Sequence, residues 1–148
     1  MERVIFVCTG NTCRSPMAEA LFKQKNKEVE VKSVGISAFP GSPISYQAKK
    51  VLQDRGMECE HIAARLTVED LDWATLVLTM TEAHKQMILS QYPKMADKVF
   101  ALKEYAYDER GNVADPFGGS VEVYEQTLQE LDKIIDRVIK KLTEGGVL

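Results

Sequence analysis

Residues 4–16, VIFVCTGNTCRSP, constrain the fold more than any other part of the chain. Residues 4–8 are uniformly apolar and are followed by a turn sequence, a pattern typical of a buried strand. Gly10 and Asn11 then favour a tight loop, because both residue types tolerate a positive φ. A proline just inside the next segment suits the first turn of a helix, so we expect a helix over residues 15–27. A strand, a tight loop and a helix in this order predict an α/β fold.

Short apolar segments alternate with helical segments along the rest of the chain. They predict further strands at residues 29–34, 76–80 and 99–102, and helices at residues 45–55, 82–91 and 121–142. The pair Thr67 and Asp70 forms a capping-box pattern ahead of one more short helix. The longest helix carries apolar residues at steps of three and four, at Tyr124, Leu128, Leu131, Ile135, Val138 and Leu142, so one face should be buried.

Helices between short apolar strands require crossover connections. The alternation therefore predicts an α/β fold with a doubly wound, four-stranded parallel sheet flanked by helices. We expect one three-layer domain over residues 1–148, since this length is close to that of a common single domain. Ligands of such sheets bind beyond the carboxyl ends of the strands, at the point where the strand order reverses, and Cys8 ends the first strand.

Charge and cysteine usage narrow the function classes. A net charge of −3 argues against a nucleic-acid binder that relies on a basic surface. The five-residue apolar run near the start is too short for a secretion signal or a membrane span, so we expect no membrane partner. Three cysteines make an odd count with no disulfide framework, which favours a reducing, cytoplasmic setting.

Cys8 and Arg14 lie at the two ends of the predicted loop, where both can face one phosphorus atom. A helix N-terminus, inward backbone N–H groups and an arginine each favour a thiolate, and each also binds phosphate oxygens. Arginine suits this position better than lysine because its fork can hold two oxygens at once. We therefore expect Cys8 to be a nucleophile of lowered pKa. The expected phosphate-binding residues are Thr9, Gly10, Asn11, Thr12, Cys13 and Arg14.

Phosphoryl transfer also needs a proton donor for the leaving group. Asp115, in the segment DPFGG, is the best candidate, because the following proline stiffens a carboxylate within a long loop. Without the cysteine loop, an Asp-Pro pair would indicate only a turn. Cys8 and Cys13 do not form a zinc site, since no histidine or second cysteine pair lies near them in the sequence, and we expect no metal and no cofactor.

The remaining cysteine and the two histidines suggest no chemistry by themselves. Cys59 is isolated and we interpret it as structural. We expect His61 and His84 to lie at the surface or on a helix face.

The sequence resembles the low-molecular-weight protein tyrosine phosphatases. Two motifs carry the resemblance, VCTGNTCRSPMAEA near the start and DPFGG before the final helix, and it covers essentially the whole chain. It implies phosphorylated protein substrates and a two-step, metal-free mechanism. In that mechanism Cys8 attacks phosphorus to give a phosphocysteine, and Asp115 protonates the leaving group and then helps water to hydrolyse the intermediate. Arg14 and the loop amides stabilise the phosphoryl group, Ser15 hydrogen-bonds the Cys8 sulfur, and Asn11 holds the loop in shape.

The resemblance also implies a redox role for Cys13. In the family, a cysteine so placed can form a reversible disulfide that protects the nucleophile from overoxidation. Alternatively, Cys13 is only a small buried residue at the start of a helix. We expect the protein to be a monomer.

Thr12 is where the loop departs from the tyrosine-specific members, which usually carry a larger aliphatic residue. The version CTGNTCRS resembles the bacterial protein arginine phosphatases of the same family. A shorter polar wall could admit a flat guanidinium, and Asp115 would suit that cation better than a neutral phenol ring. Phe39 and Phe117, the other expected walls of the substrate site, could equally stack on a tyrosine ring. We favour phosphoarginine, with phosphotyrosine as the alternative.

Two other classes remain. Thioredoxin-coupled arsenate reductases share the fold and the loop, but they need relay cysteines downstream, and residues 76–92 contain none. A catalytically silent phosphopeptide-binding module would keep Arg14 and the amides yet lose Cys8 or Asp115, and both are present.

Overall fold

A four-stranded parallel sheet organises the chain, of which the computed structural model describes residues 2–144. The strands are β1 (Arg3–Cys8), β2 (Glu30–Gly35), β3 (Leu76–Thr79) and β4 (Val99–Ala101). They are ordered β2-β1-β3-β4 and every pair is parallel. The predicted doubly wound sheet is therefore confirmed. Residue 1 and residues 145–148, the ends of the predicted domain, lie outside the described residues.

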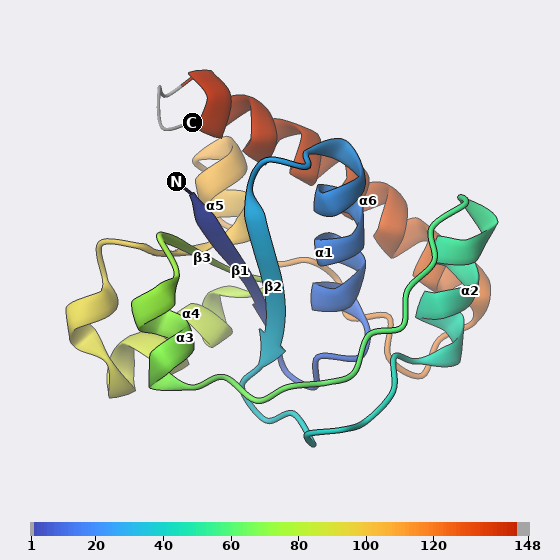
Figure 1. Cartoon of the computed structure of the whole chain (residues 1–148), viewed down its shortest axis with the longest axis horizontal. Helices are drawn as coiled ribbons and strands as arrows, with labels where there is room; N and C mark the ends of the chain where they lie inside the picture. The colour runs from blue at the N-terminus through green and yellow to red at the C-terminus, as the bar shows by residue number, and fades with distance from the viewer. Residues whose placement is uncertain (1, 145–148) are drawn as a thin grey trace.

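Helices cover both faces of the sheet (Figure 1). One face carries α1 (Arg14–Lys25), α2 (Tyr46–Asp54), α5 (Leu102–Tyr107) and α6 (Val121–Glu144). The other carries α3 (Val68–Trp73), α4 (Glu82–Gln91) and the 3-10 turn η1 (Pro93–Met95). The result is the predicted three-layer arrangement. Within residues 2–144, no helix combines the length and the apolar character that crossing a membrane requires.

The central strand β1 is buried on both sides. Val4 and Phe6 point into the core under α1 and α6, whereas Ile5 and Val7 point into the core under α3 and α4. This explains why its sequence is continuously apolar rather than alternating. On α6, all six residues of the predicted apolar stripe are buried, as the spacing required.

One helix was not predicted from the sequence. The strand expected over residues 99–102 ends at Ala101, and Leu102, the last residue of the expected strand, begins α5. The Glu104 carboxylate accepts a hydrogen bond of 3.1 Å from the Ala101 backbone N–H, which caps the start of this helix. Its buried residues are only Leu102 and Ala106, one turn apart. Two apolar positions in six residues give too little periodicity to predict a helix.

The strand order places the loop after β1 at the reversal point of the sheet. β1 has β2 on one side and β3 on the other. The chain reaches β2 through α1, on one face of the sheet, and reaches β3 through α3, on the other face. The backbone of Met80, just after β3, donates to the carbonyl of Val7 at 2.9 Å. On the other side β2 ends at Gly35, where a Cβ atom would lie 2.6 Å from the carbonyl oxygen of Thr9. Only a glycine lets β2 and the loop approach this closely.

Candidate active site

Cys8, at the end of β1, opens into a cavity of about 280 Å³. The residues that line this cavity are Cys8, Thr9, Gly10, Thr12, Cys13, Arg14, Asp115 and Phe117. The fold thus brings the segment before α6 to the loop after β1, although the two are far apart in the sequence. The predicted nucleophile, guanidinium and acid share one cavity.

Asn11 fixes the shape of the loop from a fully buried position. Its backbone adopts the left-handed conformation, with φ at 57°, which asparagine tolerates better than most residues. Its side-chain amide donates to Ser15 Oγ at 2.8 Å and to Ser33 Oγ at 3.0 Å. Its side-chain oxygen accepts from the Ala64 backbone at 2.9 Å. Asn11 therefore ties the loop to α1, to β2 and to the segment that precedes α3.

The Cys8 sulfur is buried among hydrogen-bonding groups. Ser15 Oγ lies 2.8 Å from it, and the Asn11 backbone N–H donates to it at 3.2 Å. Burial raises the pKa of the Cys8 thiol, while Ser15, the Asn11 amide and the charge of Arg14 act to lower it. The expected lowered pKa is therefore wrong in its net direction. The sequence pattern revealed the groups that favour the thiolate, but not how deeply the sulfur is buried.

Arg14 connects the loop to the predicted acid. Its buried guanidinium donates to the Val113 carbonyl at 2.9 Å and lies 3.6 Å from Oδ2 of Asp115. The Asp115 side chain is 56% exposed, and its other oxygen accepts from the Phe117 backbone at 3.0 Å. The carboxylate therefore stands at the open side of the cavity, where it can reach a leaving group.

The three residues expected to form the substrate wall lie in different places. Thr12 lines the cavity, and its backbone oxygen accepts from Ser45 at 3.0 Å. Phe117 also lines the cavity and is 79% exposed. Phe39 is 82% exposed on the segment after β2 and does not belong to the cavity lining. Cys13, the predicted redox partner, is buried with its sulfur 3.2 Å from the Tyr124 hydroxyl.

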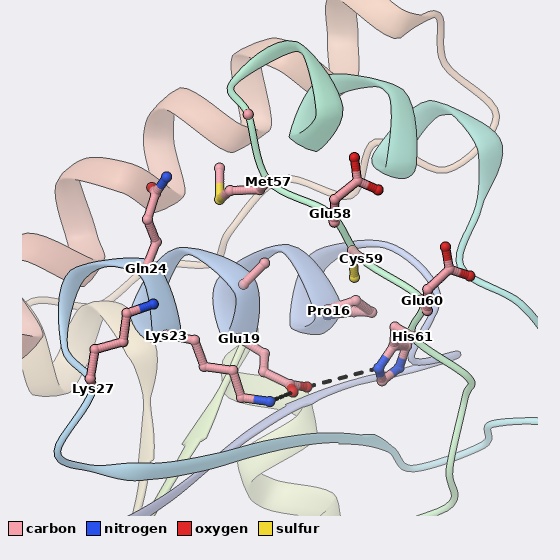
Figure 2. Close-up of a pocket in the computed structure, with 12 residues that line it drawn as sticks. Pro16, Glu19, Lys23, Gln24, Lys27, Met57, Glu58, Cys59, Glu60 and His61 are labelled. Atoms are coloured by element: carbon pink, nitrogen blue, oxygen red, sulfur yellow. Dashed lines mark hydrogen bonds and ion pairs between the residues drawn. The ribbon is translucent and has the colours of Figure 1, made fainter.

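His61 hydrogen-bonds to the loop, whereas the sequence suggested an ordinary surface or helix-face residue. Its Nε2 lies 2.9 Å from Oδ1 of Asn11 and 3.1 Å from the Asn11 carbonyl oxygen. Both of these oxygens are acceptors, so Nε2 carries the ring hydrogen. Figure 2 shows His61 and Lys23 approaching Glu19 from two sides, at the edge of a second cavity of about 540 Å³. Burial lowers the pKa of His61, so the neutral ring is favoured.

His84 contacts the loop from another element; it lies on a helix, one of the two placements expected for it, but its side chain is buried. It lies in the first turn of α4, is 6% exposed, and its Nε2 is 2.8 Å from Oγ1 of Thr9. Burial first, and then the charge of Arg14, lowers its pKa to about 4. Both histidines reach the loop from distant segments, so no local motif marked them. The one available signal was that α4 follows β3 at the edge of the sheet that holds Cys8.

The site is made of a thiol, a guanidinium, a carboxylate and backbone amides. Among residues 2–144, no three His, Cys, Asp or Glu side chains are grouped so that they could hold a metal ion.

Comparison with known proteins gives consistent matches along the chain. A model of the family described as "Low molecular weight phosphotyrosine protein phosphatase" matches residues 3–147. A protein-arginine-phosphatase of Geobacillus stearothermophilus is 50% identical over 141 residues, covering 95% of each chain. The low molecular weight protein-tyrosine-phosphatase PtpB of Staphylococcus epidermidis is 39% identical over 136 residues, covering 92% of this chain and 96% of the relative.

Solved structures also match this chain over almost its whole length. The YwlE arginine phosphatase from Geobacillus stearothermophilus superimposes with a TM-score of 0.96 at 48% identity, covering 99% of this chain and 96% of the other. A cysteine-to-serine mutant of the YwlE arginine phosphatase, solved with a phosphorylated active site serine, gives a TM-score of 0.93 at 45% identity, covering 95% of both chains. In that relative, the residue in place of the cysteine carries the phosphoryl group.

Proposed function

Because the chain belongs to the low molecular weight phosphotyrosine protein phosphatase family, and is a cysteine-dependent protein phosphatase, we propose that it removes phosphoryl groups from protein arginine side chains. The observation that carries the mechanism is the sharing of one cavity by Cys8, Arg14 and Asp115. A nucleophile, an anion-binding fork and a proton donor around one phosphorus atom are sufficient for phosphoryl transfer without a metal.

In the first step, we assign the attack to Cys8. A sulfur–phosphorus bond forms while the bond from phosphorus to the leaving group breaks, and Asp115 gives its proton to the leaving group. Arg14 can hold two of the phosphoryl oxygens, because its buried guanidinium is fixed by the Val113 carbonyl. The backbone amides of residues 9–14 complete the cradle.

In the second step, a water molecule attacks phosphorus. Asp115 takes a proton from the water, the sulfur–phosphorus bond breaks, and inorganic phosphate leaves. The thiolate is now the leaving group, and Ser15, at 2.8 Å, can donate to it. The phosphorylated serine in the cysteine-to-serine relative supports a covalent intermediate at this position.

Two features favour phosphoarginine over phosphotyrosine. Thr12 presents a short polar wall to the cavity, where a larger aliphatic side chain would crowd a flat guanidinium. The carboxylate of Asp115 at the cavity mouth suits a cationic leaving group. Phosphotyrosine remains the second candidate, since the exposed ring of Phe117 on the same cavity could stack on a phenol ring.

The test compares kcat/KM on phosphoarginine and phosphotyrosine peptides for the wild type and for Thr12→Ile. We expect Thr12→Ile to reduce phosphoarginine activity at least tenfold more than phosphotyrosine activity. Thr143→Ile, an exposed position near the end of α6, is the matched control and should change neither. Equal losses on both substrates would remove Thr12 as the selector, and turnover by Cys8→Ser would refute the central assignment.

The proposal also concerns the cellular compartment in which the protein works. A free Cys8 thiol must stay reduced to act, so a reducing cytoplasm is the setting in which we expect it to work. The monomeric state stays a prediction from the sequence.

A further inference from the structure

His84 and Thr9 form a contact that the mechanism above does not use. His84 is the third residue of α4, whose first turn is capped by the Thr81 hydroxyl, which accepts from the His84 backbone at 3.1 Å. The ring reaches across from the β3 side of the sheet to Oγ1 of Thr9, the residue next to the nucleophile. From the β2 side, the Thr9 carbonyl accepts from the Ser37 backbone at 3.0 Å. The Thr9 backbone and side chain are thus held from opposite flanks.

The ring's hydrogen can be placed by elimination. The Nδ1 atom of His84 is buried and has no hydrogen-bond partner within the described part of the chain. A buried N–H without an acceptor is rarer and costlier than a bare ring nitrogen. The neutral ring therefore carries its hydrogen on Nε2, where it is donated to Thr9 Oγ1 at 2.8 Å.

This assignment decides what the Thr9 hydroxyl can do. Since its oxygen accepts from His84, its own proton remains available for another partner. Thr9 lines the cavity beside Cys8 and Arg14, so that proton can turn toward a phosphoryl oxygen.

We propose that the Thr9 hydroxyl is an additional donor to the phosphoryl group and that His84 is the positioning residue that orients it. The proposal rests on the proposed function in one respect, that a phosphoryl group occupies the cavity. It adds a side-chain donor to the backbone amides and to Arg14.

The neutral state of His84 matters for this role. The charged groups that act on the ring are Arg14, which disfavours its protonation, and Asp115, which favours it. A protonated ring would place a second cation beside Arg14 and would turn Nδ1 into an unpaired donor. The neutral ring orients Thr9 without either cost.

The experiment is a double-mutant cycle read by binding of inorganic phosphate, measured by calorimetry, and by kcat/KM with p-nitrophenyl phosphate. We expect Thr9→Val to weaken phosphate binding about tenfold, the loss of one hydrogen bond to a charged group. Thr9→Ser, which keeps the hydroxyl, should remain within about threefold of the wild type. His84→Ala should weaken binding by a similar factor, and Thr9→Val/His84→Ala should be no worse than Thr9→Val alone.

His84→Gln supplies a rescue test, since its amide can donate from nearly the same place, and it should bind phosphate better than His84→Ala. If His84→Ala does not fold, the comparison of His84→Gln with Thr9→Val and Thr9→Ser still decides the question. Thr143→Val controls for the loss of a threonine hydroxyl elsewhere. Wild-type phosphate binding by Thr9→Val, or independent losses that multiply in the double variant, would overturn the proposal. Failure of the wild type to release phosphate from peptides would instead count against the proposed function, because the calorimetric cycle does not depend on turnover.

Discussion

The hydroxyl of Ser15 lies 2.8 Å from the sulfur of Cys8, and the side-chain amide of Asn11 donates to that same hydroxyl oxygen at 2.8 Å. Because the oxygen already accepts from Asn11, its own proton can be donated to the sulfur, which is closer than the other acceptor in reach, the Val34 carbonyl at 3.5 Å. Ser15 can therefore stabilise a thiolate both as nucleophile and as leaving group. This contact also opposes the effect of burial on the Cys8 pKa.

Ser15→Ala should slow turnover by about tenfold to a hundredfold, because a buried thiolate loses a charge-assisted hydrogen bond. The acidic limb of the profile of kcat/KM against pH should move to higher pH, since Ser15 acts to lower the Cys8 pKa. Because burial raises the pKa of Cys8, steady-state kinetics from about pH 5 to about pH 10 measure both effects. Ser90→Ala, on the exposed side of α4, is the control. An unchanged pH profile in Ser15→Ala would contradict the assignment.

Asn11 should be the most sensitive position for stability in the loop. Asn11→Ala loses several buried hydrogen bonds and places a Cβ at a positive φ, so we expect a loss of about 3 kcal/mol in the free energy of unfolding. Asn11→Gly relieves only the backbone strain and should be about 1 kcal/mol less destabilised than Asn11→Ala. Urea unfolding measures both values.

Asp108 provides a matched control, because it also has a φ of 57° but is exposed at the end of α5. There, Gly and Ala variants should differ by about the same 1 kcal/mol, without the larger loss expected for both Asn11 variants. If Asn11→Gly were as stable as the wild type, the side-chain bonds of Asn11 would contribute nothing.

Stability should fall on acidification because of His84. Its pKa is about 4 in the folded chain, whereas an unfolded histidine titrates near pH 6.5. Below about pH 6.5 the unfolded chain binds a proton that the folded chain excludes, so this contribution is complete above pH 6.5 and is lost toward pH 4. The loss approaches about 3 kcal/mol, and urea unfolding at about pH 7 and pH 4.5 should reveal most of it.

His84→Gln should reduce that dependence on pH. It should not abolish it, because burial also lowers the pKa of His61 and acts in the same direction. An equal loss of stability on acidification in the wild type and in His84→Gln would show that His84 is not the responsible group.

Mild oxidation should inactivate the enzyme reversibly through Cys13. Cys8 and Cys13 are both buried and both line the cavity, so a sulfenic acid formed on Cys8 has a second thiol on the same loop. We expect peroxide to abolish activity and dithiothreitol to restore it, with a Cys8–Cys13 disulfide detected by mass spectrometry. Cys13→Ser should make the loss irreversible, whereas Cys59→Ser should behave as the wild type. Irreversible loss in the wild type, with no such disulfide, would refute this prediction.

Most of the fold followed from local patterns. The uninterrupted apolar run of β1 and the three-and-four spacing on α6 each report burial directly, and both were predicted correctly. The helix α5 was missed because its formation depends on Glu104 capping Ala101 and on packing against α6. Such tertiary contacts leave no periodic signal in six residues.

The residues of the site also divide into those that local motifs predict and those that depend on tertiary contacts. Cys8, Arg14 and Asp115 were predicted because phosphoryl transfer requires their chemistry in recognisable motifs, and the three residues do line one cavity. His61 and His84 reach the loop from 50 and 75 residues away, and nothing in their own segments distinguishes them from surface residues. The direction of the Cys8 pKa was also beyond the sequence, because it depends on how much protein covers the sulfur.

The exposed rings of Phe39 and Phe117 contrast with the buried loop residues Cys8, Asn11 and Arg14. A substitution at either ring removes little packing, so it should change stability by only about 0.5 kcal/mol, whereas a substitution of the buried Asn11 should cost several times more. Stability therefore constrains these two exposed rings much less than it constrains the buried residues of the loop. A lineage that carries this fold can therefore change Phe117, at the cavity, and the exposed Phe39 while each intermediate still folds.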